Sequence, residues 1–324
     1  MASVRQPAVA GTFYSAQASE LENSVAAHLN SPLAWDIAAK ALVVPHAGHV
    51  YSGAIAGTAY ASVRHLAPHI TRVVLLGPAH RVAFKGIAVP SADAHATPLG
   101  NIPVDWPGVA TALALAQVHI NDAAFENEHS LEVHLPFLQR ILGDFALVPL
   151  LVGDAKPEGV EHVLRKLWGG PETLVVISTD LSHFHDYAAA QKLDASASQA
   201  IETFNVEGLT GELACGFRPL SGLLRAAQRL DLRPTTLDVR NSGDTAGDKS
   251  RVVGYGSYAF EYSGTARTPD KYRTPLLDIA QQSIRHGIKT GSCPNVEVSG
   301  FPHPMRTHRR TFVSVNAGGK LRGC

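Results

Sequence analysis

The chain has 324 residues, and its 28 Lys and Arg balance its 28 Asp and Glu, so the formal net charge is zero. This balance gives no electrostatic reason to expect a nucleic acid or an anionic membrane as partner. Hydrophobic residues make up 45% of the chain, no apolar run reaches membrane-spanning length, and the start lacks a signal-peptide pattern, which together predict a cytoplasmic globular protein. Its three cysteines are widely spaced without a CxxC pair, which argues against a disulfide framework or a structural zinc site.

Short apolar runs alternate with helical patterns along the first 260 or so residues. The helical patterns predict helices within residues 20–30, 53–66, 128–143, 159–169 and 210–230, the last of them starting near Ser221. Apolar runs predict strands within residues 41–44, 72–80, 145–154, 172–186 and 250–262. Continuously apolar strands between helices are typical of a largely parallel sheet covered on both faces. The fold class is therefore predicted as α/β, with a central parallel or mixed sheet flanked by helices.

Composition changes near residue 263, where the stretch SGTARTPDKYRTP is rich in Ser, Thr, Pro and charge. We interpret residues 1–262 as one α/β domain and residues 263–274 as a linker. Beyond the linker, residues 276–288 read as a helix, and TFVSVNAGGKLRG reads as a hairpin that turns at Ala317 and the two following glycines. Residues 275–324 are too few for a comfortable independent domain, so we expect an incomplete second module.

Three predicted strands end in turns that carry histidine or aspartate. His46 follows the strand at 41–44, His80 follows VVLLG, and Asp180 and His183 follow LVVIS. The carboxyl ends of parallel strands lie along one edge of an open α/β sheet, and ligands bind in the crevice there. A single histidine after a strand is usually a hydrogen-bonded turn residue, but three such strand ends on one edge indicate a shared functional pocket.

The segment EHSLEVH contains Glu128, His129, Glu132 and His134, and it invites comparison with a zinc protease. The two histidines are five positions apart, which puts them about 140° apart on a regular helix, so they cannot face one metal ion. Neither HExxH nor HxxEH is present, and the zinc-protease interpretation fails. The glutamate and the first histidine could cap the helix at the pocket edge, the segment could orient metal ligands from behind, or its role could be purely structural.

Cys215 stands in ELACGFRPLSG, in a turn that leads into the helix predicted near Ser221. A thiol near a helix N-terminus has a lowered pKa and can act as nucleophile or metal ligand, although buried inert cysteine is commoner. Arg218 and the neighbouring glycines could instead hold an anion. The stretch NSGDTAGDKSR has no phosphate-loop pattern, and we interpret it as a loop on the substrate side.

Seven motifs together resemble the Memo family, known in prokaryotes as AmmeMemoRadiSam system protein B. They are VRQPAVAGTFY, PHAGHVYSG, GPAH, EHSLEVHLPFLQ, STDLSHF, CGFRPLSG and NSGDTAGDKSRVVGYGSYAF, and they follow the order of the family. The resemblance covers residues 4–262 almost continuously. The segments LLDIAQQSIRHGI and TFVSVNAGGKLRGC are similar to the start of an AMMECR domain, the partner module of that system. The resemblance thus implies a Memo-like domain followed by an incomplete AMMECR-like segment.

The resemblance implies a fold similar to that of class III extradiol dioxygenases, which hold non-haem Fe(II) with two histidines and a carboxylate. In Memo proteins two histidines and a cysteine line the corresponding pocket, which implies His46, His80 and Cys215 as metal ligands here. His183 takes the position of the dioxygenase general base, oriented by Asp180. One departure from the family is His49 where Tyr is common, which adds an acid–base group at the pocket mouth.

The implied cofactor is Fe(II) or copper, with zinc as a competitor, because a thiolate in place of a carboxylate softens the site. A metal with three protein ligands keeps open positions for O₂ and a substrate, or for water. The favoured function is metal-dependent redox chemistry on an unknown small molecule or peptide, with radical-SAM and AMMECR-type proteins as implied partners. The alternatives are a non-catalytic metal- or peptide-binding adaptor and a metal-dependent hydrolase.

Overall fold

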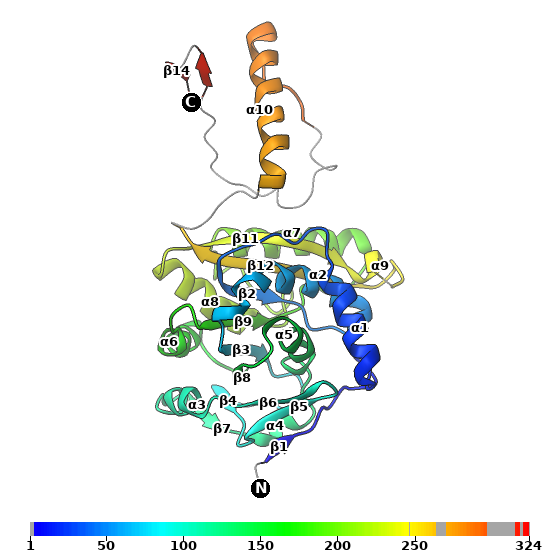
Figure 1. The fold of residues 1–324 in the computed structure, drawn as a ribbon, viewed down its shortest axis with the longest axis vertical. Helices are drawn as coiled ribbons and strands as arrows, with labels where there is room; N and C mark the ends of the chain where they lie inside the picture. The colour runs from blue at the N-terminus through cyan, green and yellow to red at the C-terminus, as the bar shows by residue number, and fades with distance from the viewer. Residues whose placement is uncertain (1–2, 246, 264–269, 297–314, 318–319, 324) are drawn as a thin grey trace. The chain divides into compact units, whose positions relative to one another are not determined.

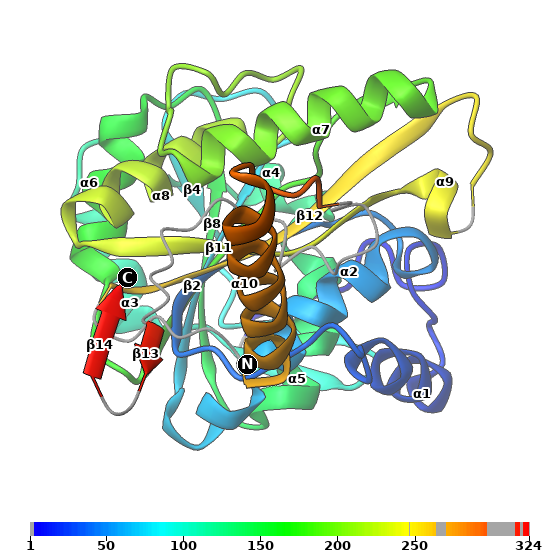
Figure 2. The ribbon, with the colours of Figure 1, turned by 90° about the horizontal axis from the view of Figure 1, so that it is seen from above.

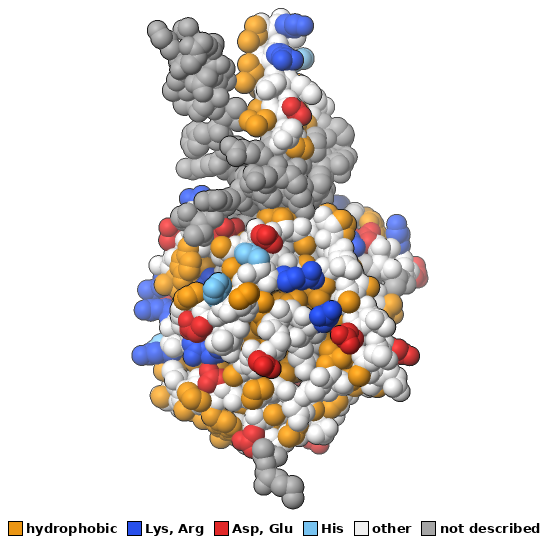
Figure 3. Space-filling view, viewed as in Figure 1, with side chains coloured by type: hydrophobic (Ala, Val, Ile, Leu, Met, Phe, Trp, Pro, Cys, Tyr) orange, Lys and Arg blue, Asp and Glu red, His pale blue; other side chains and the backbone are white. Residues whose placement is uncertain are grey.

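A computed structural model of the chain describes residues 3–245, 247–263, 270–296, 315–317 and 320–323. The chain forms two compact units, Met1–Ala266 and Arg267–Cys324 (Figure 1). Basic and acidic side chains are interspersed on the face of the first unit that Figure 3 shows. Within the described residues, none of the helices combines the length and the apolar character needed to cross a bilayer.

The first unit is built on a mixed sheet (Figure 1, Figure 2), as predicted. Its described strands lie in the order β10–β12–β2–β9–β3–β8–β4–β7, with β11 also paired to β12. In that order they span His183–His185, Val252–Tyr262, Ala39–Val44, Thr173–Ser178, Arg72–Pro78, Ala146–Val152, Ile87–Val89 and Val118–Ile120, and β11 spans Leu232–Asn241. The central strands β2, β9, β3 and β8 run parallel, whereas β12 is antiparallel to β2 and β4 is antiparallel to β8. A smaller sheet joins β1 (Val4–Arg5), β5 (Ala94–Thr97) and β6 (Gly100–Pro103).

Helices cover both faces of the large sheet, and Figure 1 shows α1, α2 and α5 on one side and α6 and α8 on the other. The first layer contains α1 (Ala18–Leu29), α2 (His49–Ser62), α4 (Asp122–Glu126) and α5 (Leu135–Leu142). The second layer contains α3 (Trp106–Leu113), α6 (Pro157–Leu167), α7 (Tyr187–Glu202) and α8 (Phe217–Arg229). Three short helices complete the unit: η1 (Arg64–His69), η2 (Glu132–His134) and α9 (Ser242–Thr245).

Alternation along the central strands divides the core into two layers. In β2, Leu42 and Val44 pack toward α1, α2 and α5, whereas Ala41 and Val43 pack toward α6 and α8. Successive side chains of a strand point to opposite faces. Every residue of β2 is therefore buried, and apart from Lys40 the strand is apolar.

Two predicted helix boundaries are wrong. Helix α8 begins at Phe217 with Gly216 as its N-cap, four positions before the predicted start at Ser221. The segment EHSLEVH is not regular helix, because regular α-helix begins only at Leu135, after the 3-10 turn Glu132–His134.

In the second unit, α10 spans Asp270–Thr290, so the predicted helix is confirmed and extends further in both directions. β13 (Val315–Ala317) and β14 (Lys320–Gly323) pair antiparallel, as expected of the hairpin. Residues 297–314 and the two glycines of the hairpin turn lie outside the described residues.

Candidate functional site

The three strands whose ends carry histidine or aspartate are neighbours in the sheet. β9 lies between β2 and β3, and all three run parallel. His46 follows β2, Asp180 and His183 follow β9, and His80 follows β3, so all four reach the same edge. The rings of His46 and His80 lie 5.1 Å apart between centroids. The convergence predicted from the strand ends is thus what the topology produces.

His46 is 2% exposed, and hydrogen bonding fixes which of its nitrogens carries the proton. Its Nδ1 lies 2.6 Å from Ser178 Oγ, and this hydroxyl donates its own proton to Ser130 O at 2.6 Å. Since the hydroxyl has only one proton, its oxygen must accept from the Nδ1–H of His46, so His46 carries the Nδ1–H tautomer. Its Nε2 therefore keeps a lone pair. Burial and the nearby histidines hold the pKa of His46 well below its usual value, so the ring is neutral.

The same hydroxyl accepts a second hydrogen bond, which extends the network into the core. His134 Nε2 lies 2.9 Å from Ser178 Oγ, and His134 Nδ1 lies 2.9 Å from Tyr60 OH. His134 therefore donates from Nε2 to the serine and accepts at Nδ1 from the tyrosine. Tyr60 and His134 are 0% and 1% exposed, so both stand behind His46 and not in a solvent-facing pocket. This arrangement corresponds to the outer contacts that orient metal-ligating histidines.

Glu128 performs the equivalent task for His80. Its Oε1 lies 2.9 Å from His80 Nδ1, and its two oxygens also accept from the backbone N–H groups of His80, His129 and Ser130. Burial alone would raise the pKa of this carboxyl, but these donors and the His80 charge lower it to about 2. The carboxylate both holds the turn and leaves Nε2 of His80 available to a metal. Of the alternatives considered for this segment, the helix cap is wrong, because the N-cap of α5 is His134, and the contacts of Glu128 are those expected of an orienting residue.

Cys215 completes the group, two residues before α8. Its Sγ lies 3.3 Å from His46 Nε2, and one donor atom from each of His46, His80 and Cys215 lies within 4.8 Å of the others. The backbone N–H of Asp180 also donates to this sulfur at 3.3 Å. The expected lowering of the thiol pKa is wrong: burial, followed by the charge of Asp180, raises it to about 12. The desolvation of the thiolate by burial raises the thiol pKa more than the nearby helix N-terminus lowers it.

Asp180 is not the group that orients His183. Its carboxylate accepts from the backbone N–H of His46 at 2.7 Å, and burial raises its pKa to about 7. His183 Nδ1 instead donates to Leu181 O at 2.8 Å, which leaves its Nε2 as a proton acceptor. Burial lowers the pKa of His183, and the charge of His80 lowers it further. The next residue, Phe184, has a left-handed φ of 64° and a 60% exposed ring, so β10 presents a strained, exposed aromatic beside this histidine.

His129 and His49 occupy different surroundings. The His129 ring stacks on His80 at 4.8 Å, and His80, Glu128 and His129 form a second group able to hold an ion. His49 is the first residue of α2, is 5% exposed and packs on Phe137 at 4.8 Å. Its predicted place at the pocket mouth is therefore wrong, because the ring points into the apolar layer between α1, α2 and α5.

A cavity of about 210 Å³ opens beside Cys215 and is also lined by Arg218. Arg218 forms an ion pair with Asp154 at 2.9 Å, which neutralises much of its charge. The predicted anion-binding role of this arginine is therefore weakened, although its position beside the site is as expected.

Sequence reasoning missed Ser178 and Tyr60. Ser178 is the first residue of the motif STDLSHF, which also contains the predicted site residues Asp180 and His183. Its position at the end of the same strand could therefore have indicated a place in the site. Tyr60 is eleven residues into α2 and is adjacent to His134 only through the fold. We find no sequence signal for it.

Comparison with known proteins gives a consistent result for the first unit. Residues 5–259 match the family model described as Memo-like protein. A MEMO1 family protein of Methanosarcina mazei is 33% identical over 271 residues, covering 80% of this chain and 99% of the relative. One from Aquifex aeolicus is 36% identical over 263 residues, covering 78% of this chain and 97% of the relative. Among solved structures, an uncharacterized protein of Escherichia coli K12 matches at 15% identity with a TM-score of 0.44, over 67% of this chain and 98% of that one.

Proposed function

The chain belongs to the Memo-like family, and from that premise we propose that it binds one metal ion through His46, His80 and Cys215 for redox chemistry on a small molecule or peptide. The observation that carries the proposal is the 3.3 Å separation of Cys215 Sγ and His46 Nε2, with His80 in reach of both. Two donors that share a tetrahedral ion at ordinary metal–nitrogen and metal–sulfur distances lie ~3.5 Å apart. The observed spacing therefore fits a shared ion without rearrangement of the backbone.

The protonation states also support the proposal. A metal-ligating imidazole must be neutral and must offer a lone pair, and His46 is neutral with its Nδ1–H donated to Ser178. The nitrogen of His80 bonded to Glu128 is likewise Nδ1, as in other carboxylate-supported ligands. Two imidazoles and one thiolate suit Fe(II), copper or zinc better than Mg²⁺ or Ca²⁺.

The bound ion would supply open coordination positions for O₂, for an electron-rich group of the substrate, or for water. The 210 Å³ cavity beside Cys215 would hold the part of the substrate that lies away from the ion, since neither His80 nor His183 is among its lining residues. His183 would accept a proton from the substrate at Nε2, because its Nδ1–H is held by Leu181 O. The proposed similarity to class III extradiol dioxygenases makes a ring-cleaving or related oxidation the first reaction class to test.

We also propose that residues 275–324 are related to AMMECR domains, and that the natural partners include AMMECR-type and radical-SAM proteins. This part of the proposal rests on the sequence resemblance alone. It is tested by co-purification of the full chain with each candidate partner.

The first experiment is anaerobic metal analysis of the full chain and of His46→Ala, His80→Ala and Cys215→Ser. We expect one equivalent of iron or copper in the wild type and a large loss in each variant. The matched control is His162→Ala, which removes an exposed histidine of α6 and should leave metal content unchanged. Equal metal content in all five proteins would show that these strand-end residues do not form the binding site.

A second experiment separates the possible functions of a metal-loaded site. Oxygen uptake in a screen of catechols and related substrates supports the redox proposal. Hydrolysis of esters or phosphoesters with zinc bound would support a hydrolase instead. Partner binding that survives His183→Ala, without turnover of any substrate, would favour the adaptor.

A further inference from the structure

A second cavity lies at the opposite edge of the same sheet. It measures about 300 Å³ and is lined by the first residues of β2 and β9, by η1 and by the last residue of β12. Because β2 and β9 are parallel and β12 is antiparallel to β2, these positions all belong to the amino edge of the central strands. The cavity is therefore separated from the candidate metal site by the length of the strands.

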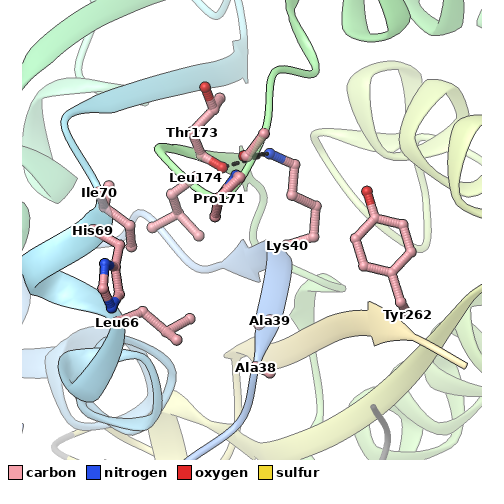
Figure 4. A pocket seen from close by; sticks show the side chains of 11 residues that line it. Ala38, Ala39, Lys40, Leu66, His69, Ile70, Pro171, Thr173, Leu174 and Tyr262 are labelled. Carbon is pink, nitrogen blue, oxygen red and sulfur yellow. Dashed lines mark hydrogen bonds between the residues drawn. The ribbon is translucent and has the colours of Figure 1, made fainter. Parts of the chain in front are cut away.

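Apolar side chains dominate this cavity, and Figure 4 shows how they are arranged. Leu66 and Ile70 stand on one side, Leu174 lies between, and the ring of Tyr262 stands on the other side. An apolar cavity of ~150 Å³ takes up benzene, so about twice that volume accommodates ~12 non-hydrogen atoms. The size is that of a small organic molecule and not of a polypeptide segment.

One buried cation stands in this apolar lining. Lys40 is 6% exposed, and its Nζ donates to the backbone carbonyls of Gly170 at 2.7 Å and Thr173 at 2.6 Å. An ammonium has three N–H donors, and within the described residues these two carbonyls are its hydrogen-bond acceptors. No ion pair joins this ammonium to a carboxylate of the described residues. Buried lysines are rarely left without a counter-ion, because desolvating a charge is costly.

The neighbouring charges do not provide that counter-ion. Glu172 is the acidic group that most affects the pKa of Lys40. Its carboxylate, however, already accepts hydrogen bonds from the Gly170 N–H and Thr173 Oγ1 and pairs with Arg72. Burial lowers the pKa of Lys40 to about 8 despite the opposing influence of Glu172. The ammonium also lies over the ring of Trp168, 5.6 Å from its centroid, but this ring carries no net charge. An anion placed in the cavity would therefore offset the desolvation of the ammonium.

We propose that this cavity is a binding site for a small amphipathic monocarboxylate, whose apolar body fills the space between Leu66, Leu174 and Tyr262 and whose carboxylate accepts from Lys40 Nζ. A carboxylate matches the single available donor better than a phosphate, which needs several donors. His69 lies at the exposed rim of the cavity and adds a second polar group there.

The test titrates octanoate and octanamide into the full chain by calorimetry, in the wild type and in Lys40→Met. Methionine preserves the length and the apolar stem of the lysine while removing the ammonium. We expect one site for octanoate, binding of octanamide weaker by about tenfold or more, and a similar loss of octanoate affinity in the variant. His80→Ala, which alters the candidate metal site, should bind octanoate as the wild type does.

Because Lys40 also holds the turn at residues 170–173, the variant could lose its fold, and a second measurement uses the wild type only. Octanoate should protect Lys40 from an amine-acylating reagent, read by peptide mass spectrometry, while exposed Lys192 of α7 reacts equally with and without it. The proposal is overturned if octanoate does not bind, if octanamide binds equally well, or if Lys40 is not protected.

Discussion

The network around Ser178 makes a quantitative prediction, tested by Ser178→Ala. The hydroxyl accepts from His46 Nδ1 and His134 Nε2 and donates to Ser130 O, and the residues involved are buried. The substitution removes all three hydrogen bonds without adding volume. Each buried polar group left without a partner costs ~1–3 kcal/mol. We expect the free energy of unfolding to fall by ~3 kcal/mol or more.

The substitution should also weaken metal binding, by a separate route. Without the serine oxygen, His46 is no longer held in the tautomer that leaves Nε2 free, so part of the population presents a protonated nitrogen to the ion. Loss of an outer contact of this kind typically lowers metal affinity ~10–100-fold. Affinity is measured by competition with a chromophoric chelator under anaerobic conditions, and stability is measured by urea unfolding of the metal-free protein.

The matched control is Ser198→Ala in α7. This serine is also buried, donates to Asp194 O and is hydrogen-bonded to Tyr258 OH, but it has no contact with the site. Its substitution should lower stability by ~1–3 kcal/mol and leave metal affinity unchanged. If Ser178→Ala loses stability but binds metal as tightly as the wild type, the tautomer argument is refuted and the network is only structural.

Three further predictions concern other parts of the first unit. Gly57→Ala places a Cβ 2.2 Å from the backbone oxygen of His28, so denaturant unfolding should show a loss of stability of ~1–3 kcal/mol, although alanine has a helix propensity better by ~1 kcal/mol. The control is Gly159→Ala, whose added Cβ has its nearest neighbour at 3.8 Å and which should be neutral or stabilising. Burial raises the pKa of Asp194 to about 6, so the native state binds this proton more tightly than the unfolded state, and the contribution of Asp194 to stability should fall by ~2 kcal/mol as pH rises from 4 to 7. Asp194→Asn lacks this contribution, so the difference in unfolding free energy between wild type and variant should change by that amount over the range, and a difference that does not change with pH would contradict the assignment. Glu128→Gln turns an amide N–H₂ toward backbone donors and should lower metal affinity ~10–100-fold, as competition with a chelator would show.

The strand-end residues were predictable because their convergence is a property of topology. Parallel strands bring their carboxyl ends to one edge whatever their order, so apolar runs ending at His46, His80 and Asp180 sufficed to place these residues together. The order of the strands in the sheet was not predicted, although β9 turns out to lie between the other two.

The remaining features depend on long-range packing that a local pattern does not record. Tyr60 and His134 are 74 positions apart and meet only because α2 and η2 pack on the same face. The thiol of Cys215 was expected to have a low pKa from its position before a helix, but burial reverses the sign. The sequence does not indicate that Lys40 is buried, because a lysine at the start of an apolar strand usually extends its ammonium into solvent.

Two of the three proposed metal ligands, His46 and Cys215, are neutral before an ion arrives. His46 is neutral because of burial, the thiol of Cys215 is protonated, and the raised pKa of Asp180 leaves that carboxyl close to its midpoint at neutral pH. Charged ligands lose their hydration when the chain folds, which costs several kcal/mol of folding free energy per charged group. Neutral donors do not incur this cost. The ionised carboxylate of Glu128, which lies behind His80, is compensated by hydrogen bonds from three backbone N–H groups and from His80. The fold can therefore hold its donors in position without a bound ion, which is the condition for a site that is organised before binding.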